Sequence, residues 1–121
     1  MKKARFTTAL IEGHKGVTAV IVPFDPEAVW DSKPVALDAR RRGYLVRGTI
    51  NGAPFDGWIG FRWGKFFIIV EPALRRAAKT AVGELVEVVV SPTTSDKAMA
   101  KAQEQAKLTT APGRRRARTA R

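Results

Sequence analysis

Hydrophobic residues in the first part of the chain occur in short runs separated by turn residues, which is the pattern of strands rather than of long helices. The runs at residues 6–12 and 17–22 predict two strands, and the glycine-rich stretch at 13–16 predicts the turn between them. Pro23 ends the second run, because proline cannot donate a hydrogen bond to a strand ladder.

The next segment begins with the pattern of a helix N-terminus. Asp25 can cap a helix with its carboxylate, and Pro26 suits the first helical position because it has no amide hydrogen to leave unpaired. We therefore expect a short helix that ends at Trp30. Residues 31–43 are irregular and include three consecutive arginines at 40–42, and for them we expect a loop with a short strand.

The strongest local pattern is a hairpin centred on Asn51-Gly52, the dipeptide that favours a two-residue type I′ turn. A two-residue loop fixes the register of the flanking strands, and a slip by one residue would turn every side chain to the other face. The register predicts an ion pair between Arg47 and Asp56. It also pairs Leu45 with Trp58, Gly48 with Phe55, and Tyr44 with Ile59.

The apolar run at residues 66–70 predicts a strand buried on both faces, and Pro72 then opens a second helix. An apolar stripe at helical spacing predicts that this helix continues to Val82, with Gly83 at its end. The stripe consists of Leu74, Ala77, Ala78, Ala81 and Val82. The last predicted strand covers residues 85–90.

These elements form a weak internal repeat of strand, short helix and strand. We therefore expect an all-β fold with two short helices over residues 1–94, arranged as a small closed or pseudo-closed β-barrel of two strand–helix–strand halves. A flexible basic C-terminal tail at residues 95–121 is expected to follow it.

Two long segments resemble a known family of domains of unknown function, DUF1905. The segments are VRGTINGAPF at residues 46–55 and FIIVEPALRRAAKTAVGELVEVVV at residues 67–90, and the Val22-Pro23 pair also fits. The family usually has Gly-Asp where this chain has Gly83-Glu84. The resemblance implies a small β-barrel near the double-split barrels of AbrB-like transcription regulators. It implies no catalytic activity, and it supplies no functional residues.

Composition restricts the possible chemistry. The 121 residues include no cysteine and only one histidine, His14, which excludes disulfides, thiolate catalysis and His- or Cys-rich metal sites. No serine-hydrolase, zinc-protease, P-loop or dinucleotide motif occurs. We interpret His14 as an exposed turn residue, and we expect neither enzymatic activity nor a cofactor or metal. No apolar run approaches the length of a membrane span, and the lack of cysteine suits a cytoplasmic protein.

The net charge of +11 is concentrated at the C-terminus, because residues 97–121 carry eight basic groups and one acidic group. This segment has no aromatic residue, so we expect it to contribute no core residue and its deletion to leave folding nearly intact. Ser95 or Asp96 can cap a short alanine-rich helix to about Leu108, with a weak stripe of Met99, Ala102 and Ala106. We expect disorder after Pro112.

Arginines without acidic neighbours bind phosphates by counterion release, without reading sequence. The leading hypothesis is therefore a non-enzymatic binding module that associates weakly with DNA or RNA. The candidate contacts are Arg114, Arg115, Arg116, Arg118 and Arg121 in the tail, and Arg75, Arg76 and Lys79 on the second helix. Residues 58–66 also interleave aromatic and basic residues, which fits either a single-strand binder or a hairpin core with solvated cations.

Two alternatives stay open. The first is a small-ligand site in the mouth of the barrel, lined by Trp30, Trp58, Trp63 and Tyr44. The second is a protein-interaction or stress-associated domain. The sequence does not decide between a monomer and a homodimer.

Overall fold

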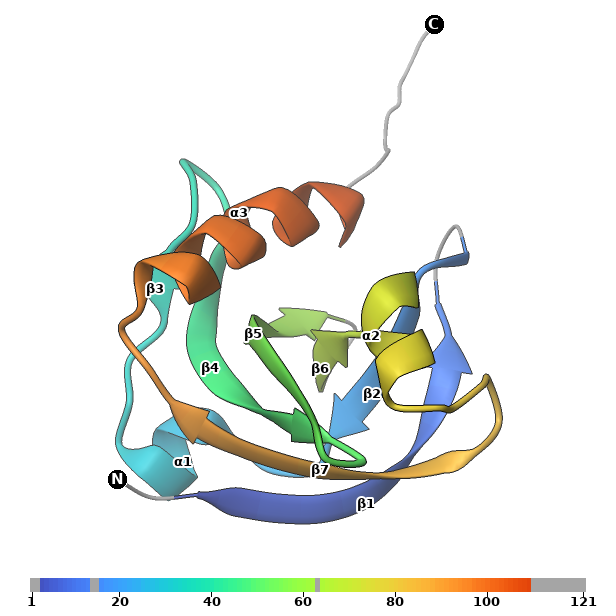
Figure 1. Cartoon of the computed structure of the whole chain (residues 1–121). Coiled ribbons are helices and arrows are strands. Elements are labelled where there is room, and N and C mark those ends of the chain that lie inside the picture. The colour runs from blue at the N-terminus through green and yellow to red at the C-terminus, as the bar shows by residue number, and fades with distance from the viewer. Residues whose placement is uncertain (1–2, 14–15, 63, 110–121) are drawn as a thin grey trace, which may run out of the picture.

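The computed structural model describes residues 3–13, 16–62 and 64–109 (Figure 1). The strands are β1 (Ala4–Glu12), β2 (Thr18–Val22), β3 (Val35–Ala36), β4 (Arg42–Ile50), β5 (Ala53–Arg62), β6 (Lys65–Ile69) and β7 (Leu85–Pro92). The helices are α1 (Pro26–Trp30), α2 (Pro72–Ala77) and α3 (Asp96–Thr109).

Six strands form a closed antiparallel barrel in the order β4, β5, β6, β2, β1 and β7, and the pairing of β7 with β4 closes the ring. The short β3 pairs with the first residues of β4. Helix α1 follows β2 and leads to β4, whereas α2 connects β6 to β7. The predicted β-barrel of two strand–helix–strand halves is therefore confirmed.

The central hairpin has the predicted register. Asn51 and Gly52 adopt φ values of 49° and 85°, as a type I′ turn requires. Arg47 lies opposite Asp56, and its Nε donates to the carboxylate across 3.0 Å. The Asn51 side chain also accepts a hydrogen bond from the Glu87 amide at 2.9 Å, which ties the turn to β7.

Gly48 allows the barrel to close, because β4 pairs at this point with both β5 and β7. A Cβ atom at Gly48 would lie 1.8 Å from the carbonyl oxygen of Val89, so no other residue fits without moving the backbone of β7. Gly48 lies opposite Phe55, as the sequence predicted. The contact that requires glycine, however, is the backbone of the neighbouring strand.

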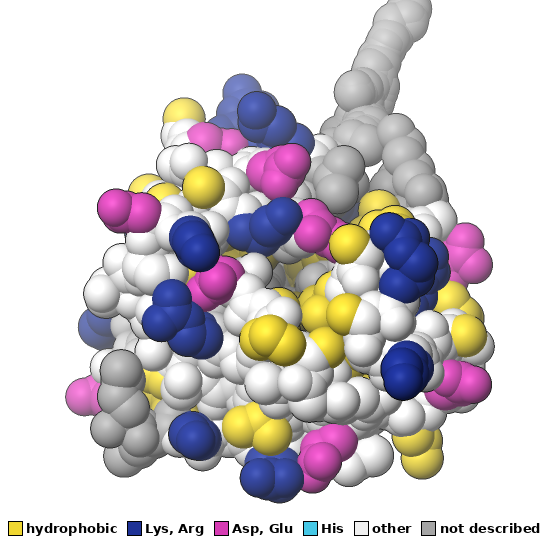
Figure 2. Space-filling view, in the orientation of Figure 1, with side chains coloured by type: hydrophobic (Ala, Val, Ile, Leu, Met, Phe, Trp, Pro, Cys, Tyr) yellow, Lys and Arg dark blue, Asp and Glu magenta, His cyan; other side chains and the backbone are white. Residues whose placement is uncertain are grey.

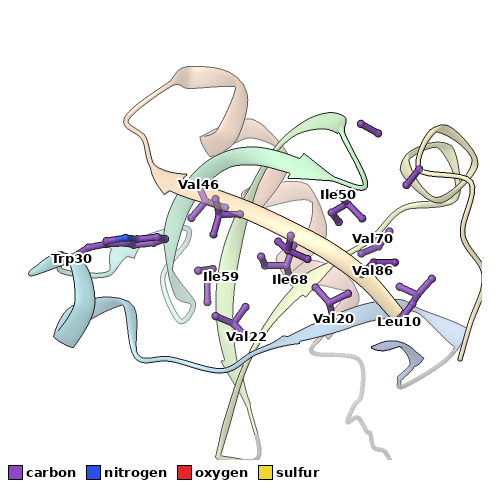
Figure 3. Packing of buried hydrophobic residues seen from close by; sticks show 14 residues of the cluster. Leu10, Val20, Val22, Trp30, Val46, Ile50, Ile59, Ile68, Val70 and Val86 are labelled. Atoms are coloured by element: carbon purple, nitrogen blue, oxygen red, sulfur yellow. The ribbon is translucent and has the colours of Figure 1, made fainter. Parts of the chain in front are cut away.

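Aliphatic side chains from all six barrel strands fill the interior (Figure 3). Trp30 of α1 lies at one end of this cluster and is 9% exposed. The fully buried large residues of the interior are Leu10, Val20, Val46, Ile50, Ile59, Ile68, Val70, Val86, Val88 and Val90.

Helix α1 matches the prediction, since the Asp25 side chain caps it by accepting from the Glu27 amide at 2.9 Å. Helix α2 does not match, because it ends at Ala77 rather than at Val82. Lys79 adopts a left-handed φ of 54°, which ends the helix and turns the chain toward β7. Val82 is consequently 47% exposed and does not belong to the core.

Helix α3 corrects the expectation that the C-terminal segment contributes no core residue. The Ser95 hydroxyl caps it by accepting from the Ala98 amide at 3.1 Å. Ala98, Ala102 and Ala106 then lie fully buried against the outside of β4 and β5 (Figure 1). The predicted disorder after residue 112 lies outside the described residues.

Candidate functional site

A groove of about 820 Å³ lies between α2 and α3, over the start of β5. Pockets that hold small ligands commonly have this size and combine apolar walls with a few polar groups. Figure 2 shows hydrophobic side chains inside a hollow on this face of the molecule. Its apolar lining includes Pro54, Phe55, Ile69, Leu74, Ala73, Ala77 and Ala100. Its polar lining consists of Asp56, Glu71, Lys97, Lys101, Glu104 and Gln105.

A polar network joins three elements at the groove. Lys101 of α3 donates to both carboxylate oxygens of Glu71, at 3.0 and 3.1 Å, and Glu71 directly precedes α2. Gln105 is only 4% exposed, and its side-chain oxygen accepts from the indole nitrogen of Trp58 at 3.1 Å. Gln105 also hydrogen-bonds to Glu71. The network thus satisfies polar groups that would be costly to bury alone.

Both charged members of the network are stabilised in their ionised forms. Burial acts to raise the pKa of Glu71, but hydrogen bonds from Gln105 and Lys101 outweigh it and hold this pKa below its ordinary value of 4.5. The hydrogen bond to Glu71 raises the pKa of Lys101 above 10.5, against the opposing effect of burial. The pair therefore stays charged over the neutral range.

The described tryptophans predicted to line a barrel mouth lie on opposite sides of the barrel wall. Trp30 belongs to the interior cluster, whereas Trp58 points outward and is covered by α3. Tyr44 is half-buried at the edge of the interior, and its hydroxyl donates to Glu27 at 3.4 Å. Trp63 lies outside the described residues. The structure therefore does not bring Trp30 and Trp58 together in one mouth.

The cations predicted on the second helix do not line the groove. Arg75 and Arg76 occupy the last turn of α2, and Lys79 follows the helix in an exposed position. Arg75 and Arg76 therefore remain on the outer surface. They do not share one helix face with Lys79, because α2 ends before that residue. The five C-terminal arginines and His14 lie outside the described residues.

The family model described as "Domain of unknown function (DUF1905)" matches residues 6–90, which is most of the chain. The chain belongs to this family. No curated protein matches it. The DUF1905 match ends within β7, so the barrel belongs to the family region while the α3 wall of the groove lies beyond it.

Two further findings concern only the described part of the DUF1905 chain. None of its helices has the length and apolar character needed to cross a membrane. No three of its histidine, aspartate or glutamate side chains are grouped so that they could hold a metal ion.

Sequence reasoning missed the groove. Glu71 and Lys101 are thirty positions apart and come together only because α3 docks beside α2. Gln105 carries no recognisable motif, since a glutamine in an alanine-rich helix is usually solvated. The alanine spacing at 98, 102 and 106 was the available signal, because it places three small residues on one face of α3.

Proposed function

We propose that this protein is a non-catalytic binding module that associates with nucleic acid, without reading sequence, through its C-terminal arginines. The distribution of charge carries the proposal. All eleven acidic residues belong to the described part of the chain, where they offset most of its cations. The five arginines between residues 114 and 121 have no acidic residue near them in the sequence.

The physical basis is counterion release. Each arginine that neutralises a phosphate displaces a condensed cation, so affinity falls steeply with salt and is insensitive to base sequence. Phosphate contacts of this kind position a protein on nucleic acid but carry no sequence information. The barrel would then act as the folded body to which this basic segment is attached.

The proposal that the module is not an enzyme is supported by the ionisation of the groove. A general acid or base works best when its pKa lies near the operating pH. Here the pKa of Glu71 is lowered and that of Lys101 is raised, so both move away from neutrality. Their arrangement suits a structural ion pair that shapes a binding surface.

The test compares the wild-type chain with a variant in which all five arginines become glutamine, in a binding titration against DNA and RNA over a salt series. The wild type should bind both, with a logarithmic salt slope of several units, and the variant should lose most of that slope. The changed positions are Arg114→Gln, Arg115→Gln, Arg116→Gln, Arg118→Gln and Arg121→Gln. Equal binding by both proteins would refute the proposal.

The groove supports a second candidate function, the binding of a small ligand with a large apolar part. The observation that favours it is the combination of an apolar floor with an ordered polar network at one wall. Because Trp58 lies in contact with Gln105 of that wall, its fluorescence should respond to an occupant. Ala77→Phe should abolish the response by filling the groove, whereas Val82→Phe, at an exposed position outside the groove, should preserve it. A ligand response that survives Ala77→Phe would place the ligand elsewhere.

A further inference from the structure

The tip of the β5–β6 hairpin combines an exposed ring with two cations. Phe61 is 59% exposed, and it is the only aromatic residue among the exposed large hydrophobic residues of the described chain. Phe66 lies opposite it on β6, with the two ring centroids 4.6 Å apart. The next pair toward the tip joins Arg62 to Lys65. Two rings and two cations therefore occupy the last two described pairs of this hairpin.

Two features of this arrangement cost the folded chain stability. Two like charges directly opposite each other on paired strands are destabilising, yet Arg62 and Lys65 occupy one such pair. A ring at position 61 also forgoes most of the burial that stabilises aromatic residues elsewhere in the barrel. Lys65 is exposed and makes no ion pair with any described residue. An anionic partner with flat apolar groups would offset both the repulsion between the two cations and the exposure of the Phe61 ring.

The rings have a fixed base. Phe66 packs at the edge of the interior cluster and contacts Tyr44 of β4, with ring centroids 6.3 Å apart. Tyr44 is anchored in turn by its hydroxyl hydrogen bond to Glu27. Phe61 is thus the outer member of a row of three rings that begins with Tyr44 at the edge of the barrel interior. A group stacked on Phe61 would meet a surface that is held in place from below.

We propose that the tip of this hairpin binds single-stranded nucleic acid, with a base stacked on Phe61 and phosphates at Arg62 and Lys65. Side chains alternate between the two faces of a strand, so the rings lie on one face of the tip and the cations on the other. A nucleotide also carries its base and its phosphate on different sides. Proteins that bind single strands without sequence preference use this combination of aromatic and basic side chains.

This inference rests on the proposed nucleic-acid function and makes it more specific. The C-terminal arginines cannot distinguish single from double strands, because both present phosphates. A stacking residue can, because only an unpaired base exposes its flat face. The hairpin should therefore give the protein a preference for single strands that the arginines alone would not produce.

The experiment measures fluorescence anisotropy of a labelled oligothymidylate of about 16 nucleotides and of a duplex of equal length, with the full-length protein. Phe61→Ala should weaken single-strand binding at least about fivefold and leave duplex binding unchanged. Phe61→Leu, which keeps an apolar side chain without a ring, should have the same effect. Phe61→Tyr should restore wild-type affinity. Lys65→Gln should lower the logarithmic salt slope on the single strand by about 0.7.

The matched control is Leu85→Ala on β7, since Leu85 is 70% exposed and lies on a strand that does not pair with this hairpin. It should leave both affinities unchanged. Equal losses from Leu85→Ala and Phe61→Ala would overturn the proposal, as would a normal single-strand affinity for Phe61→Leu. Binding of phosphatidylserine vesicles that depends on Phe61, without binding of either oligonucleotide, would assign the tip to a lipid surface instead.

The variant that lacks all five C-terminal arginines separates the two proposals. If it still binds the single strand and loses this binding on Phe61→Ala, the hairpin site stands and the arginine proposal fails. If wild-type binding is lost with the arginines and is insensitive to Phe61, the arginine proposal stands and the hairpin site is refuted. Absence of wild-type binding to both oligonucleotides would overturn both.

Discussion

The two hydrophobic clusters of this molecule share the strands β4, β5 and β6 but are closed in different ways. Adjacent residues on β4, β5 and β6 point to opposite sides of the barrel wall, so each strand serves both clusters. The neighbouring inward and outward residues are Val46 and Leu45, Ile59 and Trp58, and Ile68 and Ile69. The sheet itself encloses the interior cluster. The outer cluster depends on α3, a helix added after the ring of strands is complete.

The difference shows in what each closing element contributes. The interior is packed with branched aliphatic side chains from every barrel strand. Among the α3 side chains whose burial is described, the fully buried apolar ones are three alanines, each of which buries a single methyl group, and Met99 packs beside them partly buried. The attachment of α3 therefore relies more on hydrogen bonds than the packing of the interior does. These bonds are made by Gln105 and Lys101 to the groove wall. We expect interior substitutions to act on the whole fold and substitutions at α3 to act on its docking.

The largest expected effect comes from the interior. Ile59→Ala removes a fully buried side chain from the centre of the barrel, where the surrounding strands cannot collapse into the space. The loss in unfolding free energy should be about 2–5 kcal/mol, measured by urea denaturation. Hydrogen exchange should accelerate in all barrel strands together. A loss confined to β5 would show that the interior is not one cooperative unit.

The next effect should separate docking from folding. Gln105→Ala removes the acceptor of the buried Trp58 indole and should cost about 1–3 kcal/mol. Amide exchange should accelerate in α3 well before it does in the barrel strands. Gln103→Ala is the matched control, because Gln103 is exposed on the same helix and makes one hydrogen bond, to the Leu37 carbonyl. Equal effects from both variants would contradict a special role for the buried network.

The contrast between the clusters also explains what could be predicted from sequence. The hairpin register followed from Asn51-Gly52, because a two-residue turn fixes every pair beyond it. The barrel followed from the pattern of strands and the family resemblance. These features depend on local geometry or on long apolar runs, both of which are visible in one dimension.

The features that escaped prediction depend on neighbours distant in sequence. Ala81 and Val82 continue a helical stripe in the sequence, yet the helix ends earlier because the chain turns at Lys79 to reach β7. Just before β7, the Gly83 amide donates a hydrogen bond to the Leu10 carbonyl of β1 at 2.7 Å. The alanines of α3 resemble a solvated helix until the apolar outer face of β4 and β5 is known. The groove and its network exist only after that docking.

A smaller effect should appear in the pH dependence of α3 docking. The pKa of Glu71 is lowered in the folded state, so its contribution is present above about 4.5 and is lost as the pH falls through the folded-state pKa. The pKa of Lys101 is raised, so its contribution is present below about 10.5 and is lost as the pH rises through the raised value. Docking should therefore be constant between these limits.

Glu71→Gln tests this pH dependence, because glutamine cannot titrate. Hydrogen exchange of α3 relative to the barrel strands should lose its acid dependence in this variant. Glu87→Gln is the control, since Glu87 of β7 pairs with Arg5 of β1 at 2.7 Å, whereas α3 packs on β4 and β5. An acid dependence of α3 that survives Glu71→Gln would assign it to other carboxylates.

The smallest effect should come from an ion pair that belongs to neither cluster. Arg47 and Asp56 form the predicted cross-strand pair, but their side chains are 58% and 26% exposed. Solvent and salt screen such a pair, so a double-mutant cycle with Arg47→Gln and Asp56→Asn should give a coupling of about 0.2–1 kcal/mol that shrinks at high salt. This value sets the scale for a polar contact that does not belong to the network of Glu71, Lys101 and Gln105. A coupling as large as the Gln105→Ala loss would mean that polar contacts stabilise the exposed wall of the barrel as strongly as they hold α3.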